Sequence, residues 1–86
     1  MDKPIEVLKA HYDSKAQVLA MAMEEMDWPK SDYSLIVWYY NRLGLNHFLR
    51  VWQEQSYENE RRPPRSKYRA FRARLSKALT LSSNSN

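Results

Sequence analysis

The strongest chemical signal in the sequence is a basic segment in its C-terminal third. Residues 61–77 contain eight Lys and Arg residues and no acidic residue. Positive side chains along a helix neutralise phosphates and release their counterions, so such a segment is typical of nucleic-acid binding. The predicted phosphate contacts are Arg61, Arg62, Arg65, Lys67, Arg69, Arg72, Arg74 and Lys77.

Two aromatic residues within this segment, Tyr68 and Phe71, could stack on unpaired bases. They also fall on one helical stripe with Leu75 and Leu79, which favours a place in the core for their rings. The charges spread over much of the helix circumference and form no single base-reading edge, so sequence-specific readout is not indicated. A plain solvated basic surface is the simplest alternative, and the choice between DNA and RNA stays open.

The charge is distributed unevenly along the chain. Residues 1–57 carry six Lys and Arg against eight Asp and Glu, whereas residues 58–86 carry eight against two. A basic C-terminal element therefore calls for an acidic partner, outside the chain or within it. Three acids, Glu24, Glu25 and Asp27, could form a solvated turn or a docking patch for the basic segment.

A second set of residues could bind a partner protein. Tyr39, Arg42 and Arg50 could lie on one polar surface, and Tyr and Arg are favoured anchors in protein interfaces. They could equally rim the core. A protein-binding adaptor or inhibitor, with an acidic protein surface as its partner, is thus the alternative to nucleic-acid binding, and self-association is a further possibility.

The sequence shows no catalytic or metal-binding pattern. Its two histidines, His11 and His47, have no further ligand at helical spacing, there is no cysteine, and the single glycine excludes a glycine-rich phosphate loop. No nucleophile is paired with a base. We therefore predict a protein without catalytic activity, metal or cofactor.

A helix-turn-helix motif around Gly44 fits poorly. The positions that usually hold a small and an aliphatic residue hold Tyr40 and Arg50. The N-terminus lacks a continuous apolar run, and no apolar stretch reaches the roughly 20 residues of a membrane span. A soluble, cytoplasmic protein is expected.

A run of six apolar or aromatic residues, 35–40, predicts the central element of the fold. Ser31 or Asp32 could cap a helix over 32–43, and Gly44 could end it in a left-handed conformation. A buried strand or a hairpin turning at 41–44 is the alternative for this run. Trp38 is predicted to be a core anchor because the segment has so little polar circumference.

Helical periodicity predicts three further helices, at about 4–27, 46–61 and 66–80, followed by a disordered tail at 81–86. Asn46 could cap the third helix of the chain. A break at Asp13 and Ser14 could divide the first helix in two. The predicted fold is a single all-α domain over 1–80, in which three antiparallel helices form a cluster and a basic amphipathic helix follows Pro63 and Pro64.

Overall fold

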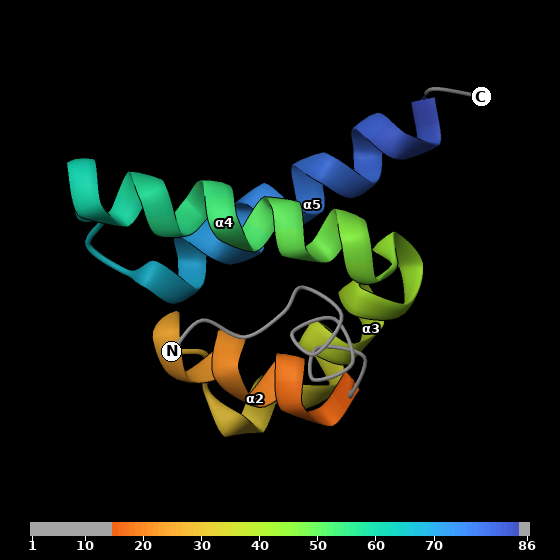
Figure 1. Ribbon diagram of the computed structural model, residues 1–86, viewed down its shortest axis with the longest axis horizontal. Coiled ribbons are helices and arrows are strands. Elements are labelled where there is room, and N and C mark those ends of the chain that lie inside the picture. Colours follow the sequence, from red (N-terminus) through yellow and green to blue (C-terminus); the bar gives the residue numbers. More distant parts are fainter. Residues whose placement is uncertain (1–14, 85–86) are drawn as a thin grey trace, which may run out of the picture.

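The computed structural model describes residues 15–84, and every regular element in this range is helical. The all-α prediction is confirmed for this part of the chain. In Figure 1, α4 and α5 lie one behind the other on one side of the molecule, and α2 lies on the other side. The helices are α2 (Lys15–Glu25), the short η1 (Lys30–Asp32), α3 (Tyr33–Leu43), α4 (Leu45–Arg61) and α5 (Lys67–Asn84).

The helix predicted at 4–27 is represented by α2, which ends at Glu25, and the part predicted at 4–14 lies outside the described residues. Asp27 has a left-handed φ of 54° just beyond this end. The Trp28 N–H donates to the Met23 carbonyl at 2.9 Å, and the Asp27 N–H donates to the Glu24 carbonyl at 3.5 Å. This pattern is a Schellman motif, which usually uses glycine at the left-handed position. As predicted, Trp28 lies outside the helix, before Pro29.

The apolar run at 35–40 forms the middle of α3, so the strand alternative is wrong. Ile36 and Tyr39 are buried, but Trp38 is 43% exposed, and its prediction as a core anchor is also wrong. A helix that packs with one side buries only part of its circumference, whatever its composition. The buried tryptophans are Trp28 at 4% exposure and Trp52 at 8%.

Gly44 joins α3 to α4 in a conformation that other residues avoid. Its φ is 85° and its ψ is 164°, and its N–H donates to the Tyr40 carbonyl at 2.8 Å. The predicted positive φ is confirmed. Gly44 also precedes α4, which begins at Leu45, so Asn46 lies inside the first turn and is not the predicted cap.

We expect Gly44→Ala to lower the free energy of unfolding by about 1–3 kcal/mol, because this backbone region is nearly restricted to glycine. A Cβ at this position would have no atom within 4 Å, so the cost arises in the backbone and not from a clash. Chemical denaturation measures it. Asn46→Ala is the matched control and should change stability by less than about 0.5 kcal/mol. A larger loss in the control would restore Asn46 as the cap.

The core lies where α5 meets α3 and α4. Phe48 of α4 and Phe71 of α5 are fully buried, with ring centroids 5.8 Å apart, and Phe71 also meets Trp28 at 5.9 Å. Leu75 lies one turn further along α5 and is fully buried too. The basic helix is therefore part of the core and not a free arm. It reaches Asn84, so residues 81–84 belong to a helix and not to the predicted tail.

Candidate nucleic-acid interface

Helix α5 has two contrasting faces. Phe71 and Leu75 point into the core, while Arg69, Ala73 and Ser76 are exposed. These positions follow the predicted helical stripe, because residues three and four apart lie on the same side of a helix. The packing of the apolar stripe therefore turns the opposite, basic side of α5 toward solvent.

The two aromatic rings of the basic segment are held inside the protein. Phe71 is fully buried, and the half-buried Tyr68 packs its ring against Trp28 with centroids 4.7 Å apart. The Tyr68 hydroxyl donates a hydrogen bond to the Asp32 carboxylate. Asp32 therefore makes no capping bond to α3, contrary to one option predicted from the sequence. Neither Tyr68 nor Phe71 is free to stack on a base.

Arg72 is exposed, and its position is fixed by Tyr68. Its Nη1 donates to the Tyr68 hydroxyl at 3.1 Å, and the guanidinium carbon lies 5.8 Å from the centre of the Tyr68 ring. This hydrogen bond raises the pKa of Arg72, and the Asp32 charge adds to the effect. The guanidinium is thus a permanently charged group held at the edge of α5.

Arg74 is bound to α4. Its Nε donates to the Gln55 side-chain oxygen at 2.8 Å, and its Nη1 lies 3.7 Å from the Glu54 carboxylate. Gln55 is only 4% exposed and donates in turn to Asn59 at 2.8 Å. Arg74 therefore joins α5 to α4, and the nearby Glu54 carboxylate offsets part of its positive charge. No sequence pattern indicates this role for Gln55, because its burial depends on how α4 packs against α5.

Arg69 and Arg72 lie on the side of α5 that faces α3. Together with Tyr39, Ala73 and Ser76 they line a shallow hollow of about 420 Å³. None of these residues is acidic. We call this site the α3–α5 hollow. Two exposed guanidinium groups one helical turn apart make it suited to an anion, although the Asp32 carboxylate offsets part of the Arg72 charge.

On the opposite side of α5 the charges are mixed. Arg50, Arg74 and Lys77 line a second hollow with Glu54 and His47, and Arg62 lines a third with Glu58. Acids interspersed with the basic groups weaken the attraction of this side for phosphate.

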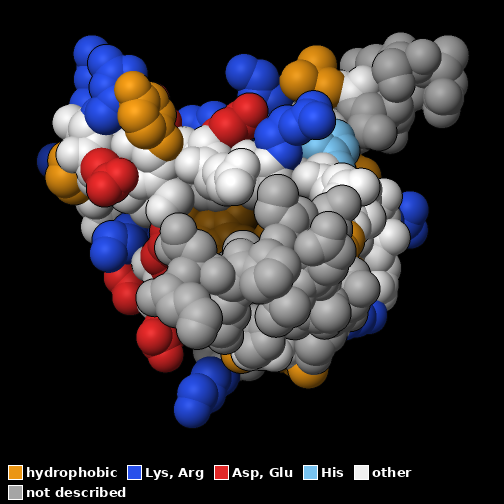
Figure 2. Space-filling view, viewed as in Figure 1, with side chains coloured by type: hydrophobic (Ala, Val, Ile, Leu, Met, Phe, Trp, Pro, Cys, Tyr) orange, Lys and Arg blue, Asp and Glu red, His pale blue; other side chains and the backbone are white. Residues whose placement is uncertain are grey.

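The remaining basic residues of the segment lie apart from the α3–α5 hollow. Arg61, Arg62 and Arg65 are exposed around the end of α4, and Arg61 lies over the Tyr57 ring at 5.5 Å. Lys67 lines a hollow with Glu24 and Glu25. On the face drawn in Figure 2, Lys and Arg side chains occupy several separate places and form no single patch. The eight predicted contacts are therefore divided among several surfaces.

The predicted protein-binding residues differ in their exposure to solvent. Tyr39 is only 6% exposed, which agrees with the alternative that it rims the core, whereas Arg42 and Arg50 are exposed. Arg42 lies over the ring of Trp38, with 4.5 Å between its guanidinium carbon and the ring centroid. Trp38 is an exposed aromatic residue that the sequence pattern placed in the core.

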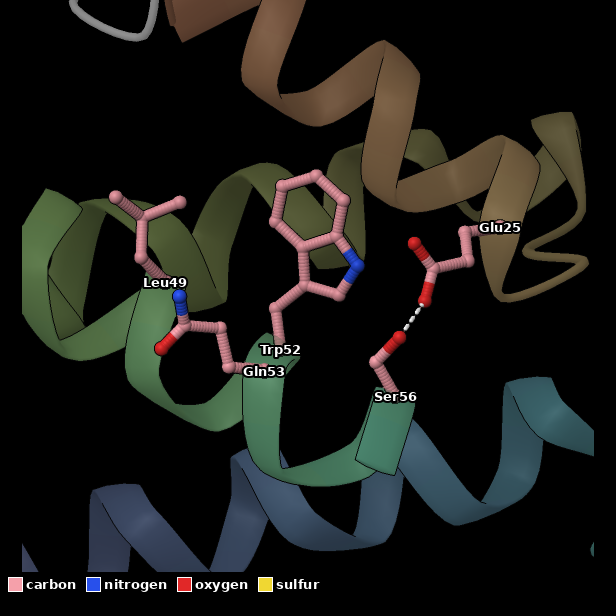
Figure 3. Close-up of a pocket in the computed structure, with 5 residues that line it drawn as sticks. All are labelled: Glu25, Leu49, Trp52, Gln53 and Ser56. Carbon is pink, nitrogen blue, oxygen red and sulfur yellow. Dashed lines mark hydrogen bonds between the residues drawn. The ribbon is translucent and has the colours of Figure 1, made fainter. Parts of the chain in front are cut away.

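Within residues 15–84, the acids near the end of α2 form no ion pair with the basic segment. The ion pair found in this range joins Arg74 to Glu54. Glu25 instead accepts a hydrogen bond from Ser56 of α4. Figure 3 shows this bond at the edge of a hollow of about 240 Å³, into which Trp52 points. The contact attaches the end of α2 to α4.

Among residues 15–84, no cluster of three or more His, Cys, Asp or Glu side chains could hold a metal ion, and no helix has the length and apolar character to cross a bilayer. Comparison of the whole chain with protein-family models, curated proteins and solved structures finds no significant match.

Proposed function

We propose that the protein binds nucleic acid without sequence specificity, through phosphate contacts made by α5. The observation that carries the proposal is the α3–α5 hollow, where Arg69 and Arg72 are exposed and no acidic residue lines the surface. Lys77 adds a third exposed charge to the same helix, on the side where Glu54 and Glu58 also lie. Arg74 contributes less, because Glu54 and Gln55 already bind its guanidinium.

The proposal is tested by a triple substitution, Arg69→Gln, Arg72→Gln and Lys77→Gln. Each basic side chain that neutralises a phosphate on duplex DNA contributes about 0.9 to the slope of log affinity against log salt, so the variant should flatten that slope by about 2–3 units. Affinity should fall about equally for unrelated sequences. Fluorescence anisotropy at several salt concentrations measures both effects.

A matched control removes three charges outside α5 by Lys15→Gln, Lys30→Gln and Arg50→Gln. Both triple variants lower the net charge by three. The control residues are exposed and lie outside α5, so the control leaves that helix unchanged. This control should keep most of the slope. The proposal is wrong if the two triple variants lose affinity equally, or if the parent binds no nucleic acid at low salt.

A protein-binding adaptor is the second candidate, and two exposed aromatic residues of α3 favour it. Tyr33 is 46% exposed and Trp38 43% exposed on that helix. Exposed aromatic residues beside arginine are common anchors of protein interfaces. Binding that resists salt but is lost when these rings are removed would support this candidate, because screening weakens phosphate contacts much more than apolar ones.

A further inference from the structure

Trp38 lies outside the buried core, unlike the other two tryptophans. Trp28 and Trp52 are buried in the core, whereas 43% of Trp38 faces solvent. A large aromatic side chain gains free energy from burial, so a ligand that covered this indole would gain that free energy on binding.

The indole contacts a residue that lines the α3–α5 hollow, although Trp38 itself is not among the lining residues. Its ring meets the Tyr39 ring edge-on with centroids 5.2 Å apart, and Tyr39 lines the hollow together with Arg69 and Arg72. Arg42, one turn along α3, places its guanidinium 4.5 Å from the centre of the indole. Arg42 therefore lies beside the exposed ring, while Arg69 and Arg72 lie in the hollow that Tyr39 also lines.

We propose that this surface binds single-stranded nucleic acid, with Trp38 stacking on an unpaired base while Arg69 and Arg72 contact the flanking phosphates. The inference rests on the proposed function and adds the class of nucleic acid. A ring beside a positively charged groove is the usual platform for single strands, because every base has a face that can stack. In a duplex the bases already stack on one another, and the indole would gain little.

The charge of the surface favours a nucleic acid over a protein as the occupant. No acidic residue lines the α3–α5 hollow, and Arg42 adds a further cation beside the indole. A single strand offers both an anion and an aromatic base at each nucleotide, which matches this combination. An acidic peptide offers the charge but need not offer a ring.

The experiment compares a short single strand of mixed sequence, as RNA and as DNA, with a duplex of the same sequence at low salt. Trp38→Ala should weaken binding of the single strand about 5- to 150-fold, which corresponds to the loss of one stacked base. It should leave the affinity for the duplex unchanged. Trp38→Phe should restore part of the affinity, because a smaller ring can still stack.

Tyr57→Ala is the matched control. Tyr57 is 59% exposed and also has an arginine over its ring, Arg61, but it lies on α4 away from the hollow. This variant should bind both forms like the parent. In a second readout, a bound single strand should protect the parent from acrylamide quenching, since Trp38 is the exposed tryptophan of the three.

The inference is overturned if Trp38→Ala weakens neither form, or weakens both equally, while the substitutions at Arg69 and Arg72 still reduce duplex binding; the proposed function then stands alone. Failure of the parent to bind any nucleic acid overturns both. Both are also overturned if the parent binds polyglutamate but not the oligonucleotides and Trp38→Ala abolishes that binding. This result would identify an acidic protein as the partner. Different affinities for RNA and DNA, each dependent on Trp38, support the inference and identify the preferred strand.

Discussion

Trp28→Ala should unfold the protein or bring it close to unfolding. Trp28 is 4% exposed, meets the rings of Tyr68 and Phe71, and donates its indole N–H to the Asp32 carbonyl at 2.8 Å. Removing a buried tryptophan costs about 3–5 kcal/mol, and a domain of this size has a stability of about 5–10 kcal/mol. Urea denaturation followed by circular dichroism measures the loss.

Trp38→Ala provides the control for this prediction, because it removes the same side chain from an exposed position. We expect its stability to lie within about 1 kcal/mol of the parent, since Trp38 forms no part of the buried core. If Trp38→Ala were the more destabilising of the two variants, the packing described for α3 would be wrong.

The second large effect is expected for Phe71→Ala. Phe71 is fully buried between Trp28 and Phe48, and it connects α5 with the rest of the core. We expect a loss of about 3–5 kcal/mol in the free energy of unfolding. The transition should stay single, because the cavity lies in a core that all the described helices from α2 to α5 share.

Leu81→Ala is the control, and it tests whether any truncation on α5 lowers the free energy of unfolding as much as Phe71→Ala does. Leu81 is on the same helix but 59% exposed, so its truncation should change stability by less than about 0.5 kcal/mol. Circular dichroism and tryptophan fluorescence should report the same midpoint for each variant. Two separate transitions in Phe71→Ala, with α5 melting first, would show that the helix is an independent arm.

Periodicity predicted the helices well, because a stripe of apolar residues determines which side of a helix is buried. Phe71 and Leu75 of α5 and Phe48 of α4 are buried as the stripes require. The tryptophans were harder to assign. Trp28 lies outside any helix and belongs to no stripe, yet its ring fills the core, whereas Trp38 lies in an apolar run and is exposed. Hydrophobicity alone does not say which side of a run meets a neighbour.

The candidate site was predicted in outline only. The sequence indicated a basic amphipathic helix, and the exposure of Arg69, Arg72 and Lys77 agrees with that pattern. It could not show that Arg74 is bound by Glu54 and Gln55, because this pairing depends on the register between α4 and α5. Nor could it show that Tyr39 of α3 lines the same hollow, with the exposed Trp38 against its ring.

The packing of α5 has a consequence for regulation by mass action. The helix that offers its charged side to solvent also supplies Phe71 and Leu75 to the core, so the charged side exists as a surface only while the domain is folded. An anionic ligand held there would be linked thermodynamically to folding, adding about 2.7 kcal/mol of stability at a free concentration one hundred times its dissociation constant. In a domain with a core this small, the folded fraction would therefore rise as more of the ligand binds to α5.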